Sequence, residues 1–181
     1  MQPYMLMVSA QSADQNYIST YRYTDVSTFI GEHQYYDGLG RLVGKTAVGL
    51  SPASGVDLVE NITYDGFGQV KRSGKKVGLS GNNGKYTVIS QDQYVADYKD
   101  PYAYEEYTYE ASPLGRKLRE AGPGATWIMQ GKCQTASYLT NSSSAHLGCL
   151  LFEVDHDKLV NNSYYPEGAL DVVKSVDEDG R

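Results

Sequence analysis

The chain has 181 residues, a length that suits a single domain of ordinary size. Its net charge is −6. Its Lys and Arg residues form no basic stripe, so binding to a nucleic-acid backbone is not expected. No apolar run approaches the roughly 18–20 residues that a membrane span needs. Seventeen tyrosines, against three phenylalanines and one tryptophan, favour half-buried β-structure.

Residues 1–15 are interpreted as an N-terminal tail or edge segment, and residues 16–181 as a single all-β domain with little helix. The first eight residues, Met1 to Val8, have neither a basic start nor a full apolar segment, so a signal peptide is not expected there. If the protein is exported, we expect its signal to lie outside this sequence.

Alternation of apolar and polar residues with period two predicts strands along most of the chain. These strands are expected at 16–24, 29–36, 57–64, 102–109, 147–154 and 170–176. The tyrosines of 102–109 change parity at Glu105-Glu106, which predicts a β-bulge there. Residues 116–121 fit either a short helix or a strand. The pattern predicts antiparallel hairpins that form curved sheets, sandwich-like or partly rolled.

A short motif recurs where strands are expected to end. Tyr36-Asp37-Gly38-Leu39-Gly40-Arg41 is echoed by Tyr64-Asp65-Gly66-Phe67-Gly68-Gln69, by a looser copy at 109–118 and by a partial copy at 176–181. The acidic residue can cap turn amides, glycine supplies a positive φ, and arginine can pair with the acidic residue of its own or a neighbouring unit. The motif therefore predicts a hairpin at each copy. Its residues are Tyr36, Asp37, Gly38, Gly40, Arg41, Tyr64, Asp65, Gly66, Gly68, Tyr109, Glu110, Gly115, Arg116, Asp177, Gly180 and Arg181.

These copies occur in a fixed order with other short motifs. The others are Asp57-Leu58-Val59, Gly81-Asn82-Asn83-Gly84, Gly122-Pro123-Gly124 and Tyr138-Leu139-Thr140-Asn141. The ordered set, over residues 16–181, resembles the uncharacterised N-terminal domain of Bacteroidetes Rhs/YD-repeat proteins. The resemblance implies export to the cell surface or beyond and a downstream YD-repeat array in the same polypeptide as partner. Two residues depart from the pattern of the family: Gln69 in place of arginine, and Gly115 where similar proteins often have asparagine. These departures concern the exact geometry of the hairpins and not the resemblance itself.

The sequence contains no motif that predicts catalysis, a metal site or a cofactor. Cys133, His146, Cys149 and His156 fit no standard zinc spacing, and the acidic run at 177–180 lacks the distal glutamate of a calcium loop. Cys149 belongs to an apolar run, which predicts an inert thiol in a buried strand. Whether it pairs with Cys133 is open.

The function expected from these observations is a structural, scaffolding or capping module of an exported surface protein, without catalysis of its own. A carbohydrate- or protein-binding module that uses exposed tyrosines, with a surface glycan or protein as partner, is an alternative. A hydrolase with paired carboxylates is a further one. The strand at 170–176 is expected at a sheet edge, and the copy at 177–181 is expected to be the start of a further repeat that the sequence cuts short.

Overall fold

The structure is a computed structural model that describes residues 12, 14–26, 28–144 and 146–181. Most of the segment interpreted as an N-terminal tail, including the residues tested for a signal peptide, lies outside the described residues. The strands are β1 (Asn16–Tyr23), β2 (Phe29–Tyr36), β3 (Leu42–Val48), β4 (Val56–Tyr64), β5 (Val70–Gly74), β6 (Val77–Ser80), β7 (Tyr104–Tyr109), β8 (Lys117–Ala121), β9 (Gln134–Thr140), β10 (Leu150–Asp155), β11 (Lys158–Tyr164) and β12 (Asp171–Val176). The helices are α1 (Gln91–Tyr98) and α2 (Ala125–Ile128).

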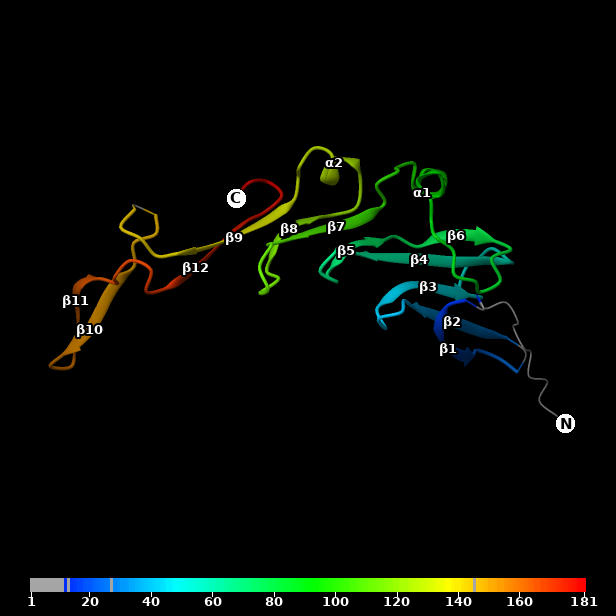
Figure 1. Ribbon diagram of the computed structural model, residues 1–181, viewed down its shortest axis with the longest axis horizontal. Helices are drawn as coiled ribbons and strands as arrows, with labels where there is room; N and C mark the ends of the chain where they lie inside the picture. Colours follow the sequence, from blue (N-terminus) through cyan, green and yellow to red (C-terminus); the bar gives the residue numbers. More distant parts are fainter. Residues whose placement is uncertain (1–11, 13, 27, 145) are drawn as a thin grey trace.

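Ten strands form one open antiparallel sheet in the order β1-β2-β3-β4-β5-β7-β8-β9-β12, with β6 paired to β4 off this path. The remaining strands, β10 and β11, form a separate two-stranded sheet. The molecule is long, with β1 to β3 toward the N-terminal end and the β10–β11 hairpin at the opposite end (Figure 1). The prediction of an all-β fold built from antiparallel hairpins is confirmed.

The hairpins predicted at the first two motif copies are also confirmed. Strands end at Tyr36 and Tyr64, and their partners begin at Leu42 and Val70. The predicted edge strand is present as β12. It is the last strand in the order of the sheet and pairs with β9 along one edge only. The stretch at 116–121 is a strand, β8, and not a helix.

The bulge predicted at Glu105-Glu106 is wrong. The pairing of β7 with β5 is regular there, and the register shift of the β7–β8 pair falls instead between Thr108 and Tyr109. Equivalent shifts occur at Tyr35/Tyr36 in β2 and Thr63/Tyr64 in β4. Each motif hairpin therefore carries its bulge beside the turn, where one extra residue of the outgoing strand is accommodated.

The core lies between the sheet and a cover formed by the segment after β6. Tyr94 of α1 packs with Val77 and Tyr104 in the main buried cluster. Helix α1, which the alternation pattern did not predict, begins with a capping box between Ser90 and Gln93. The Asn61 side chain fixes the cover to β4. Its Nδ2 donates to the Thr87 carbonyl at 3.1 Å, and its Oδ1 accepts the backbone N–H of Ile89 at 2.6 Å.

Candidate functional site

The first motif copy forms a turn held by one carboxylate, an arrangement called here a turn lock. The backbone N–H of Asp37 donates to the carbonyl of Arg41 at 2.9 Å, and Gly40 has a φ of 76°. Oxygen Oδ1 of Asp37 accepts the backbone N–H groups of Leu39 and Arg41, both at 2.9 Å. These bonds, first among them the one from the Arg41 amide, hold the pKa of the Asp37 carboxyl below its ordinary value.

The second copy repeats this geometry without the arginine. Oxygen Oδ1 of Asp65 accepts the N–H groups of Phe67 and Gln69, both at 2.9 Å, and Gly68 has a φ of 83°. The Asp65 N–H donates to the Gln69 carbonyl at 2.9 Å. Replacing arginine by glutamine therefore leaves the turn itself intact.

The third copy is two residues longer, and its lock is built from a glutamate. The Glu110 N–H donates to the Arg116 carbonyl at 3.0 Å, and the Arg116 guanidinium grips the Glu110 carboxylate with bonds of 2.8–3.0 Å. The Ser112 hydroxyl donates to the same carboxylate at 2.7 Å. The bonds from Arg116, followed by that from Ser112, lower the pKa of Glu110 to about 2.

A fourth lock lies where no motif was predicted. The Asn141 N–H donates to the Leu170 carbonyl at 3.0 Å, and the Leu170 N–H donates back to Asn141 Oδ1 at 2.9 Å. Gly168, with a φ of 74°, donates to the Asn141 carbonyl at 2.9 Å, as Gly40 donates to Asp37. The turn between β9 and β12 is therefore a motif turn into which the segment 142–169, called here the arm, is inserted.

The partial copy at the C-terminal end has the same local bonds but another place in the sheet. Asp177 Oδ1 accepts the N–H groups of Asp179 at 3.0 Å and Arg181 at 2.8 Å. Because neighbouring strands are antiparallel, the turns after β2, β4, β7 and β9 lie at one end of the sheet, whereas the turn after β12 lies at the other. The copy that follows 109–116 in the sheet is therefore Asn141 and not Asp177.

Two of the locks are joined to the next strand by an arginine and a tyrosine. The Arg41 guanidinium, 2.7 Å from the Asp37 carboxylate, lies 4.5 Å from the ring centre of Tyr64. The Tyr64 hydroxyl donates to the Leu42 carbonyl at 2.8 Å. A cation over an aromatic face adds an attraction that is independent of the backbone ladder.

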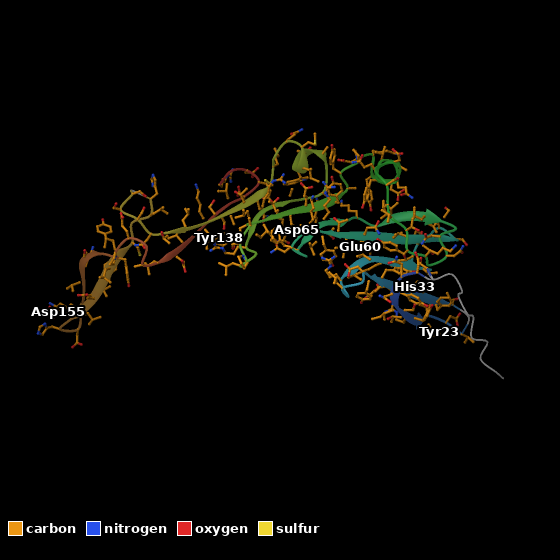
Figure 2. The ribbon with its side chains drawn as sticks, viewed as in Figure 1. Tyr23, His33, Glu60, Asp65, Tyr138 and Asp155 are labelled. Carbon is orange, nitrogen blue, oxygen red and sulfur yellow. The ribbon has the colours of Figure 1, made fainter. Side chains whose placement is uncertain are left out.

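The same contact recurs from the third lock to β9. Arg116 lies 4.4 Å from the ring centre of Tyr138, and the Tyr138 hydroxyl donates to the Lys117 carbonyl at 3.2 Å. Tyr138, labelled on β9 in Figure 2, therefore stacks on Arg116 in the same way as Tyr64 stacks on Arg41. Each arginine is held between the acid of its own turn and a tyrosine of the next strand.

The junction that lacks this arginine is joined in another way. The Gln69 side chain approaches Gly115 so closely that a Cβ there would lie 2.1 Å from its Nε2 atom. Three residues farther along β5, Arg72 pairs with Glu106 at 2.8 Å and stacks at 4.6 Å on Tyr104. At this junction the guanidinium–tyrosine contact is therefore made by Arg72, farther along β5, and not by the residue that closes the turn.

Two buried polar side chains, His33 on β2 and Asp57 on β4, lie beneath the loop around Gly84. His33, labelled on β2 in Figure 2, is fully buried, and its Nδ1 lies 2.7 Å from the Ser19 hydroxyl. Among the described residues its Nε2 has no hydrogen-bond partner. Burial lowers the pKa of His33, and Asp57 opposes this in part. Gly84 donates its N–H to Asp57 at 2.7 Å and accepts a bond from the Tyr35 hydroxyl, whose pKa burial raises to about 12.

The cysteines and the other histidines are not brought together. Among the described residues no group of three or more His, Cys, Asp or Glu side chains is placed to hold a metal ion. Cys133 and Cys149 are both free thiols, and the Cys133 sulfur accepts a bond from Arg119 Nε at 3.1 Å. The His156 imidazole lies 2.6 Å from the carboxylate of its neighbour Asp155, on an exposed turn.

The prediction that Cys149 belongs to a buried strand is wrong. Cys149 precedes β10 and is half-buried, and the side chains of Leu150, Phe152 and Val154 are exposed. The reason is tertiary, because the hairpin projects from the large sheet and no element in the described part of the chain covers it. In the part of the chain that is described, no helix has the length and apolar character to cross a bilayer.

The turn locks are thus the recurring arrangement of charged side chains in this molecule. A family model described as a domain of unknown function (DUF6443) matches residues 8–140, which contain the first three locks and end with β9. The comparison with curated proteins gave no match, and neither did the comparison with solved structures. Because the family match covers most of the chain, this protein belongs to the family of domains of unknown function DUF6443.

Proposed function

We propose that this domain is a structural module without catalysis of its own, which scaffolds or caps a repeat array in an exported surface protein. The observation that carries the proposal is the contact that joins two of the locks to the next strand. Arg41 and Arg116 each bridge the acid of their own turn and the tyrosine of the following unit. A contact repeated in this way serves to continue a sheet from unit to unit.

The chemistry of the motif residues supports the same proposal. The carboxylates of Asp37 and Glu110 accept bonds from turn amides and from their own arginines. Catalytic acids and bases instead need reach toward a substrate and a pKa near the working pH. The lowered pKa of Glu110 keeps this carboxyl charged and paired with Arg116.

The more specific part of the proposal is membership in an Rhs/YD-repeat surface protein. It is supported by the ordered motifs of the sequence and by the common geometry of the turns. A downstream YD-repeat array in the same polypeptide is the proposed partner, and the cell surface or the extracellular space is the proposed location. Surface labelling of the full-length protein in its host, with a membrane-impermeant reagent, tests the location. Labelling only after lysis would contradict it.

Hydrogen exchange measured residue by residue tests the scaffold role. If the junctions couple the units, the amides of β3, β4, β8 and β9 exchange as one cooperative block. The Tyr138→Leu variant removes the ring beneath Arg116 and is expected to weaken protection in β8 and β9. Protection that changes only at residue 138 would show that the contact does not couple strands, and would overturn the proposal.

A binding module remains the second candidate, and one observation favours it. Tyr21 and Tyr23 of the edge strand β1 are exposed on one face, at 39% and 64%, beside Phe29. Exposed aromatic rings of this kind stack on sugars and on peptide side chains. Titration of the protein against a panel of glycans, with Tyr23→Ser as the variant and Tyr165→Ser as the control, tests this candidate. Saturable binding that only the Tyr23 variant loses would support it.

A further inference from the structure

The loop at 81–87, called here the latch loop, joins β6 to α1 and is held to the sheet by buried polar side chains. Five polar or charged side chains are buried among the described residues, and four of them lie at this loop: His33, Thr46, Asp57 and Asn82. The Thr46 hydroxyl and the Asn82 side-chain amide both donate to the Lys85 carbonyl, at 3.0 and 2.9 Å. The closed loop therefore depends on a few directional bonds.

These side chains converge on Gly84. Its N–H donates to the Asp57 carboxylate at 2.7 Å, and its carbonyl accepts a bond from the Tyr35 hydroxyl. A Cβ at this position would lie 2.9 Å from His33 Nε2, so the imidazole packs directly against the glycine. Side chains of β2 and β4 thus fix a single residue of the latch loop from three directions.

His33 suits this position in its neutral form. Its Nδ1 shares a hydrogen bond with the Ser19 hydroxyl at 2.7 Å, whereas its Nε2 has no hydrogen-bond partner in the described part of the chain. An imidazolium carries an N–H on both ring nitrogens. A proton would therefore place a charge and an unbonded donor beneath Gly84, which is costly in a buried site. Burial accordingly lowers the pKa of His33, and Asp57 opposes this in part.

The titratable groups around His33 offer its charged form one partner. The residues that face it are Ser19 and Tyr21 of β1, Tyr35 of β2, Thr46 of β3 and Asp57 of β4, with Tyr86 of the latch loop packed on Tyr35. Tyrosine is neutral at ordinary pH, so Asp57 is the ionised side chain of this set. Asp57 is already bonded to the Gly84 N–H. An imidazolium can gain this carboxylate only by taking it from the loop.

We propose that His33 is a proton-sensitive latch, which keeps the latch loop closed when the imidazole is neutral and opens it when the imidazole takes up a proton. In the open state water reaches His33 and Asp57, so both charges are solvated. Opening also frees the chain that leads into β1, because the Tyr86 N–H donates to the Ser12 hydroxyl at 3.1 Å. The proposal concerns the loop above β2 and β4 and does not depend on the scaffold role of the turn locks.

The direction of the response follows from proton linkage. In the open loop His33 has its ordinary pKa of 6.5, and in the closed loop its pKa is lower, so the open state binds the proton more tightly. The population of the open state therefore rises as the pH falls below 6.5. The rise is at most about tenfold per pH unit, and it ends below the pKa of the closed state.

Hydrogen exchange of the full chain, followed by NMR at about pH 7.5 and about pH 5, tests the latch. The amides of Gly84 and Tyr86 report on the loop, and the Gln69 amide, held by Asp65, is the reference. After correction for the intrinsic pH dependence of exchange, the protection of Gly84 and Tyr86 is expected to fall about three- to thirtyfold at the lower pH. Gln69 is expected to stay nearly constant. Low concentrations of urea are expected to leave the loop response unchanged, because a local opening exposes little surface.

A matched pair of variants assigns the response to His33. His33→Gln takes up no proton in this range and is expected to abolish the loss of protection. His146→Gln, at an exposed position, is expected to keep it. If His33→Gln fails to fold, an NMR titration of the wild type replaces it, in which the Gly84 amide and the His33 ring are expected to share one midpoint below pH 6.5.

Three results would overturn the proposal. The first is equal protection of Gly84 at the two pH values, or a loss that His33→Gln retains. The second is a loss that urea enlarges as it enlarges global unfolding. The third is a Gly84 amide that titrates independently of the His33 ring.

Discussion

Asn141 and Leu170, which stand 29 positions apart in the chain, are joined by the same two bonds that join Asp37 to Arg41. In both turns the first residue donates its N–H to the carbonyl of the second and accepts the N–H of the second on a side-chain oxygen. The lock therefore depends on the two closing residues and not on the length of chain between them. A turn built in this way can accept an insertion, because its bonds leave the sheet register unchanged.

Asn141→Ala is expected to destabilise the protein by about 1–3 kcal/mol, because the Leu170 N–H and the Pro166 carbonyl lose their bonds to the buried Asn141 side chain. Asn141→Asp is expected to destabilise as well, although aspartate serves in other locks, because a carboxylate cannot donate to the Pro166 carbonyl. Urea denaturation measures both effects. The control is Asn161→Ala on the exposed hairpin, for which a change as large as that at Asn141 would contradict the prediction.

Arg116→Lys is expected to lower the unfolding midpoint, because an ammonium group cannot bond the Glu110 carboxylate in two places while it stacks flat on Tyr138. Thermal melts of Arg116→Lys, Tyr138→Leu and the double variant measure the coupling of the two side chains. Arg22→Lys on the exposed strand β1 is the control. Additive effects of the two substitutions would mean that the stacking contact contributes nothing.

The paired carboxyl of Glu110 is expected to make the domain sensitive to acid. Its pKa is about 2 in the folded protein against an ordinary value of 4.5, so the folded state favours the charged form. The resulting stability is complete above about pH 4.5 and is lost as the pH falls toward about 2. Glu110→Gln is expected to flatten the stability profile in this window. Unfolding midpoints measured at several pH values check this, and an unchanged slope in the variant would contradict it.

His33 is expected to make the stability of the fold depend on pH in a second, less acidic pH range. Burial lowers its pKa below the ordinary 6.5, so the unfolded chain binds the proton more readily than the folded one. Stability is therefore highest above pH 6.5 and falls as the pH drops below that value. His33→Phe is expected to remove this slope, whereas His156→Gln on an exposed turn is expected to keep it. Chemical denaturation at pH values on both sides of 6.5 is the measurement.

Gly84→Ala is expected to destabilise the protein more than Gly81→Ala does. Both glycines have a positive φ, 76° and 68°, so both substitutions carry a backbone cost of about 1 kcal/mol. A Cβ at Gly84 would in addition lie 2.9 Å from His33 Nε2, whereas no atom of the described residues lies within 4 Å of one at Gly81. The difference, measured by urea denaturation, is expected to be about 1–3 kcal/mol. Equal effects would mean that the loop moves away from His33 without cost.

The sequence by itself determined the hairpins and their turns. Alternation of apolar and polar residues placed the strands that end at Tyr36 and Tyr64, and the Asp-x-x-Gly spacing placed the carboxylates and positive-φ glycines that close them. These features depend on residues within a few positions of one another, where side-chain chemistry acts directly on the backbone. The Ser90–Gln93 capping box that begins α1 was equally local and could have been found.

Only the tertiary structure decided which turns are equivalent. The lock between Asn141 and Leu170 cannot be recognised locally, because the arm separates its two halves and asparagine replaces the acid. The stacking of Arg116 on Tyr138 likewise depends on strand register. The exposure of Phe152 and Val154 depends on which surfaces meet, since an apolar run is buried only where another element covers it. Alternation specifies the faces of a strand, and packing alone determines what those faces contact.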